Sequence, residues 1–116
     1  MKIFISGPMS GYKDNNAGSF FAMEHAIKLL DHDVYNPAWN DYGVQWRRAD
    51  YLAMDIMALS RCDMMVQLDG WEGSRGCLVE KVFAETAGIT IVDQDYILGL
   101  VRKREENRDP YTITRD

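Results

Sequence analysis

Residues 64–76 read MMVQLDGWEGSRG, and this stretch decides the fold. The apolar run at 64–68 has the length of a buried strand, and the turn formers after it end that strand. Ser74 is placed to cap a helix that continues to about Ala87, where Gly88 supplies a C-terminal stop. A strand followed by a loop and a helix is the repeating unit of parallel α/β domains.

The same alternation continues on both sides of this unit. The residue pattern predicts strands at 2–6, 33–35, 64–68 and 89–92, and helices from about 19, at about 47–60, at 74–87 and at about 96–107. Alternating strands and helices imply right-handed crossovers and a parallel sheet. We therefore predict a single-domain α/β fold, a Rossmann-like or flavodoxin-like three-layer sandwich with four or five parallel strands in the order 2-1-3-4.

Composition narrows the function classes. The chain has 116 residues, 47% of them hydrophobic and 27% charged, which is typical of one ordinary globular domain. Its net charge of −5 argues against a nucleic-acid polymer as partner, because phosphate contacts need a basic face. No apolar run approaches the ~20 residues of a membrane helix, and no secretory leader is recognisable. We expect a cytoplasmic protein with no membrane partner and with reduced cysteines at 62 and 77.

The expected sheet reverses between its first and third strands, and ligands in such sheets bind outside the carboxyl ends of the strands at that reversal. Loops 7–11 and 69–76 flank this point. Gly73 and Gly76 allow close backbone approach, and Ser74 with the free amides of a helix start suits a phosphate or a sugar hydroxyl. A glycine-rich turn with Ser74 as a plain N-cap fits the spacing equally well. Neither a Walker A loop nor GxGxxG is present.

Two carboxylates are candidates for chemistry. On a helical projection Glu80 falls on the face of Gly76 and Ala84, where a charge is costly to bury unless it is paired or functional. Asp55 lies at the edge of the apolar stripe of the preceding helix. The alternatives are a rim glutamate that reaches solvent and a polar boundary residue.

Aromatic and basic side chains around the loops form a second group of candidates. They could stack on a nucleobase or merely roof a small core. The aromatic members are Trp39, Tyr42, Trp46 and Trp71. Arg47 and Arg48 are either a solvated helix start or a phosphate clamp, and the solvated reading is favoured for Arg48. Two cysteines and two histidines offer no zinc spacing, so no metal or cofactor is expected.

Three motifs together resemble the nucleoside 2-deoxyribosyltransferase superfamily, most closely its short phage and bacterial members. They are FISGPMSG at 4–11, Asp55, and GWEGSRGCLVE at 70–80. The superfamily includes the 2′-deoxynucleoside 5′-monophosphate N-glycosidases. The resemblance covers residues 1–95, and 96–116 would be a C-terminal helix and tail of the same domain. It implies a protein of a bacterial cell or phage-infected host.

The resemblance also implies roles for individual residues. Glu80 corresponds to the carboxylate nucleophile that attacks C1′ of the deoxyribose, and Asp55 to the acid/base that protonates the departing base. Ser74 would bind the 5′ side of the substrate, and Gly7 would let the first loop pass close to the sugar. Two departures stand out: relatives commonly have a tyrosine where this chain has Phe4, and the N-glycosidases have an arginine where it has Ser10.

The sequence thus leads to two hypotheses. The first is an enzyme that cleaves, and in the presence of a second base re-forms, the N-glycosidic bond of a 2′-deoxynucleoside or its 5′-monophosphate through a covalent glycosyl-Glu80 intermediate. Its site would include Gly7, Ser10, Gly73, Ser74, Gly76, Trp46, Arg47 and Trp71. The alternative is a non-catalytic nucleotide-binding or nucleotide-sequestering protein, which the changes at positions 4 and 10 would suit. Because relatives complete their sites across a subunit interface, the resemblance implies a homodimer or larger homo-oligomer.

Overall fold

The computed structural model describes residues 1–40 and 47–108 of the chain. Four parallel strands form one sheet in the order β2-β1-β3-β4, as predicted. Their bounds are Lys2–Ser6 (β1), Asp33–Tyr35 (β2), Met64–Gln67 (β3) and Thr90–Asp93 (β4). The helices are Ala17–Leu29 (α1), Arg48–Leu59 (α2), Arg75–Ala87 (α3) and Gln94–Glu106 (α4).

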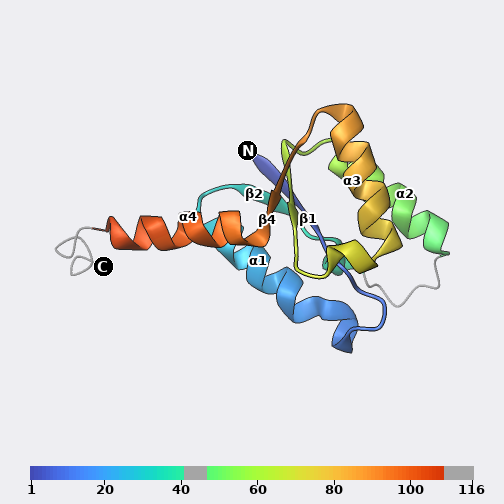
Figure 1. The fold of residues 1–116 in the computed structure, drawn as a ribbon, viewed down its shortest axis with the longest axis horizontal. Coiled ribbons are helices and arrows are strands. Elements are labelled where there is room, and N and C mark those ends of the chain that lie inside the picture. The colour runs from blue at the N-terminus through green and yellow to red at the C-terminus, as the bar shows by residue number, and fades with distance from the viewer. Residues whose placement is uncertain (41–46, 109–116) are drawn as a thin grey trace.

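The helices cover the two faces of the sheet in pairs, with α1 and α4 on one face and α2 and α3 on the other (Figure 1). Alternation along β1 sends Ile3 and Ile5 toward α1 and α4, and sends Phe4 toward α2 and α3. All three side chains are at most 1% exposed. Burial on both faces explains why β1 reads as a continuous apolar run.

Capping side chains determine where the helices on either side of β4 begin. The Ser74 hydroxyl accepts a hydrogen bond from the backbone N–H of Cys77, and Gly88 ends α3 with a left-handed φ of 75°. The Asp93 carboxylate accepts from the backbone N–H of Tyr96. This cap starts α4 at Gln94, two residues before the predicted start, because the aspartate at the end of β4 also serves the helix.

The C-terminal helix α4 belongs to the same core as the rest of the sheet. Ile97 is 1% exposed among the residues of α1 and β1. Farther along, the Arg104 guanidinium donates to the Leu29 carbonyl oxygen and pairs with the Asp31 carboxylate. None of the described helices has the length and hydropathy needed to cross a membrane.

Candidate active site

A cavity of about 360 Å³ opens at the carboxyl end of β1, beside the start of the helix that follows β3. Its floor is formed by Ile5 and Gly7, at the end of β1 and just beyond it, and one wall by Pro37, which follows β2. The other walls come from α2 and from the first part of α3. The cavity therefore lies at the reversal of the strand order, where open α/β sheets bind ligands.

The helix α2 presents a single stripe of side chains to this cavity. Its members are spaced 3, 1 and 3 residues apart, so they share one helix face: Arg48, Tyr51, Leu52 and Asp55. The rise of an α-helix places Asp55 about 10 Å deeper along the axis than Arg48. A cation therefore stands at one end of the stripe and a carboxyl group at the other.

Glu80 lines the same cavity from α3 and is only 6% exposed. The Ser6 hydroxyl donates a buried hydrogen bond of 2.7 Å to Glu80 Oε1. The other carboxylate oxygen, Oε2, has no hydrogen-bond partner among the described residues. Unlike Gln67 Nε2, which is fully enclosed and unpaired, Oε2 keeps some accessible surface. Oε2 is therefore the oxygen open to the cavity.

Burial changes the protonation of both carboxyl groups. Desolvation raises the pKa of Glu80 from 4.5 to about 8; the hydrogen bond from Ser6 opposes this rise, and the nearby Asp55 carboxylate adds to it. Desolvation also raises the pKa of Asp55 to about 7. Because the two groups influence each other, the proton that they retain near neutral pH belongs to the pair. Both carboxyl groups therefore titrate well above the usual carboxyl range, so each can hold or release a proton near neutral pH.

Glycines bring the two predicted loops together. A Cβ on Gly7 would lie 2.7 Å from Leu68 Cδ1 and 3.0 Å from Leu68 Cβ, so a side chain there would force Leu68 to shift. Gly70 has a φ of +88°, and a Cβ on it would lie 2.5 Å from the Tyr12 hydroxyl oxygen. Gly76 borders the cavity, with Ser74 Oγ at 3.9 Å as its nearest neighbour for a Cβ.

Most of the predicted site residues meet at this cavity, including both carboxylates. Those that line it are Gly7, Ser10, Asp55, Ser74, Gly76 and Glu80. Gly73 and Trp71 are not among its described lining residues, and the Lys81 ammonium lies 5.1 Å from the centroid of the Trp71 ring. Trp46 and Tyr42 lie outside the described residues.

The two neighbouring arginines at the start of α2 have different roles. Arg47 turns back to form an exposed ion pair with Asp50, 3.3 Å between Nη2 and Oδ1, and it does not line the cavity. Arg48 is exposed, as sequence reasoning favoured, but it also lines the cavity and has no ion pair or hydrogen bond among the described residues. The 3–1–3 spacing from Arg48 to Asp55 is the signal that would have chosen between them.

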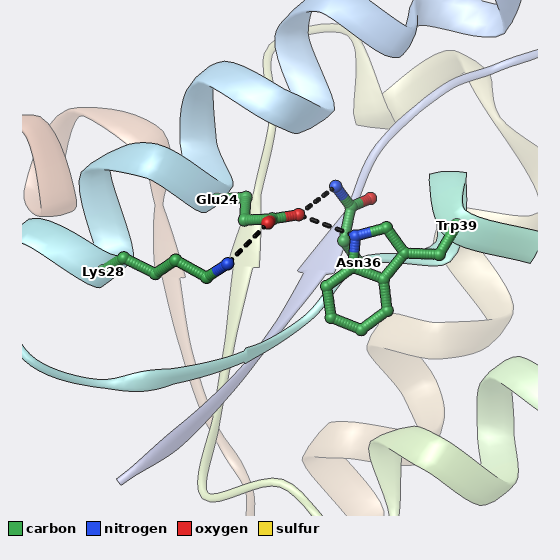
Figure 2. A network of polar contacts seen from close by, with 4 residues as sticks. All are labelled: Glu24, Lys28, Asn36 and Trp39. Carbon is green, nitrogen blue, oxygen red and sulfur yellow. Dashed lines mark hydrogen bonds and ion pairs between the residues drawn. The ribbon is translucent and has the colours of Figure 1, made fainter.

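The wall that carries Pro37 is held in place by a carboxylate on α1. Glu24 Oε1 accepts hydrogen bonds from Asn36 Nδ2 at 3.0 Å and from Trp39 Nε1 at 2.7 Å, while Oε2 pairs with Lys28 (Figure 2). The hydrogen bonds and the positive charge of Lys28 hold the pKa of Glu24 below its usual value despite partial burial. This network explains the place of Trp39, which sequence reasoning could not separate from a base-stacking role.

The described residues contain no cluster of three or more histidine, cysteine, aspartate or glutamate side chains arranged to hold a metal ion. The polar side chains that line the cavity carry carboxyl, hydroxyl, thiol and guanidinium groups.

Residues 1–93 match the family described as Domain of unknown function (DUF4406), and the chain belongs to that family. Among solved structures, the fold is similar to the 2-desoxiribosyltransferase from Leishmania mexicana, with a TM-score of 0.64 and 19% sequence identity. The similarity covers 79% of this chain and 62% of that one, so the chain spans less than two thirds of the enzyme's length. A comparison with curated protein sequences finds no match.

Proposed function

We propose that this protein cleaves the N-glycosidic bond of a 2′-deoxynucleoside or its 5′-monophosphate. The observation that carries the proposal is the buried pair of Glu80 and Asp55 in one cavity at the reversal of the sheet. The similarity of fold to a 2-desoxiribosyltransferase supports the same substrate class. The cavity is also large enough for part of a nucleoside, since ligand sites usually begin at about 300 Å³.

The proposed reaction has two steps. Ionised Glu80 attacks C1′ through Oε2 as the C1′–N bond breaks, and Asp55 transfers its proton to the departing base. Water then attacks C1′, Asp55 takes up one of its protons, and the bond to Glu80 breaks to release the free sugar. A second base in place of water completes a transfer instead. A 2′-hydroxyl would withdraw electrons from the cationic transition state, so this reaction should favour deoxyribose over ribose.

The position of Arg48 favours the 5′-monophosphate over the nucleoside. Ser10 and Ser74 line the same cavity, and the guanidinium has no competing anion among the described residues. A phosphate would satisfy the cation by charge-assisted hydrogen bonds. The glycosidic bond would lie at the opposite end of the cavity, beside Glu80 and Asp55, because a carboxylate there stabilises the positive charge that develops on the sugar.

We also propose that a second copy of the chain covers the outer face of α2 and α3. Two neighbouring grooves on this face are almost wholly apolar, and Val79 and Phe83 line both. Met57 and Val82 are 62% and 61% exposed, which is unusual for large apolar side chains. Leu52 lines both this face and the cavity, so a partner there would adjoin the site.

The deciding experiment is a panel of deoxynucleosides and deoxynucleoside 5′-monophosphates incubated with the purified protein, with released bases separated by chromatography. We expect base release from at least one compound, and a loss of several orders of magnitude in Glu80→Ala. Glu85→Ala, on the exposed face of the same helix, is the matched control. Release from no compound refutes the proposal, and tight nucleotide binding without release supports the non-catalytic alternative.

A further inference from the structure

We propose that Ser6 is the positioning residue of the nucleophile: its hydroxyl stabilises ionised Glu80 and aims Oε2 at the substrate. The proposal rests on the function proposed above in naming Glu80 as the nucleophile. Ser6 is not among the site residues that the sequence suggested.

The backbone of Ser6 is held rigidly. It is the last residue of β1, it pairs with Gln67 in β3, and its carbonyl oxygen accepts a 2.8 Å hydrogen bond from the N–H of Leu68. The side chain is 1% exposed and lies on the face of the sheet that α3 covers. A donor on a central strand is fixed more precisely than one on a loop.

Phe4 lies one strand period earlier on the same face and has a different task. It is fully buried against Leu59 and Ala84, and its ring stacks on Tyr35 with 5.6 Å between the centroids. Of the two side chains that β1 presents to this face, Phe4 therefore fills the apolar core, and Ser6 carries the donor that reaches Glu80.

The hydrogen bond gives the two oxygens of Glu80 different environments. The hydroxyl of Ser6 has one proton, and the 2.7 Å contact assigns it to Oε1. This contact leaves Oε2 open to the cavity and restricts rotation of the carboxylate. A donated hydrogen bond also favours the charged form of an acid, so Ser6 acts against the desolvation that would keep Glu80 protonated.

Four other titratable or charged groups line this cavity, and one of them is the Tyr51 phenol on α2. Asp55 on α2 raises the pKa of Glu80, and Cys77 on α3 is a buried thiol whose own pKa is raised by burial. Arg48 lines the cavity from the start of α2. No described residue other than Ser6 donates a hydrogen bond to Glu80, so the effect of removing this hydroxyl should be distinct.

The test compares Ser6→Ala and Ser6→Cys with Ser19→Ala, which removes an exposed hydroxyl on α1. The pKa of Glu80 is measured by NMR titration of ¹³C-labelled glutamate carboxyls, with the signal assigned by its loss in Glu80→Gln. We expect Ser6→Ala to raise this pKa by about 1 to 2 pH units, because the variant loses a hydrogen bond that favours the ionised form of Glu80 by an equivalent free energy. Ser6→Cys, a weaker donor of similar size, should give a smaller rise.

Activity supplies the second readout. In Ser6→Ala we expect kcat to fall at least about tenfold with little change in KM, and the alkaline limb of the kcat/KM profile to move to higher pH. A Glu80 pKa that is unchanged or lowered in a folded Ser6→Ala protein overturns the proposal, as does a loss of kcat equalled by Ser19→Ala. If the unsubstituted protein releases no base, the proposed function fails, while the NMR titration still decides the role of Ser6.

Discussion

Replacing Glu80 with glutamine should stabilise the fold at neutral and alkaline pH while it abolishes catalysis. Glutamine has nearly the same shape, and its carbonyl oxygen can accept the hydrogen bond from Ser6. The folded protein raises the pKa of Glu80 from 4.5 to about 8, so the carboxyl group favours folding below pH 4.5 and this contribution is lost as the pH rises through 8. At about 1.4 kcal/mol per pKa unit, ionisation costs the fold about 5 kcal/mol at most.

The assay is urea unfolding at pH 5, 7 and 9, followed by tryptophan fluorescence or circular dichroism. The unfolding free energy of the unsubstituted protein should fall relative to that of Glu80→Gln by several kcal/mol from pH 5 to pH 9. With slopes of about 1–3 kcal/mol per M urea, the midpoints should separate by at least about 1 M. Glu85→Gln removes an exposed carboxylate from the same helix and should leave the pH dependence nearly unchanged. Parallel curves for Glu80→Gln and the unsubstituted protein would refute the reasoning.

Three further predictions concern the site and its surroundings. Catalysis needs one ionised and one protonated carboxyl group, so the pH profile of kcat/KM should be bell-shaped with limbs near pH 7 and 8. Asp55→Asn should lose base release by at least about 100-fold. Activity that is flat from pH 5 to 9 would contradict this prediction. Arg48→Ala should raise KM for a deoxynucleoside 5′-monophosphate at least about tenfold more than KM for the nucleoside. Arg47→Ala should change both KM values equally and weakly. Equal effects of the two variants would contradict the proposal that Arg48 binds the phosphate. Val82→Lys should convert a dimer to a monomer in analytical ultracentrifugation, and a protein that is already monomeric at high micromolar concentration would exclude the proposed interface.

The position of Glu80 shows how a local pattern can find a functional residue without explaining it. The helical projection placed it on the inner face of α3, and the structure confirms its burial. The sequence could not show how that burial is tolerated, because the donor, Ser6, is 74 residues away in the chain. Only the pairing of β1 with β3 brings the end of the first strand beside the first turns of α3.

The elements themselves followed from local rules. Apolar runs ending at turn formers predicted the strands, and Ser74 and Gly88 predicted the ends of α3, because capping hydrogen bonds and left-handed glycines act over three or four residues. The strand order 2-1-3-4 followed in the same way, since right-handed crossovers leave few layouts for this alternation.

The sequence by itself therefore determined the alternation of strands and helices, the sheet order and the two carboxylates worth attention. The tertiary structure decided that Arg48 rather than Arg47 borders the cavity, that Trp39 is bound to Glu24, and that the Ser6 hydroxyl contacts Glu80. These outcomes depend on contacts between side chains from distant segments. Such contacts are set by packing across the whole sheet rather than by neighbours in the chain.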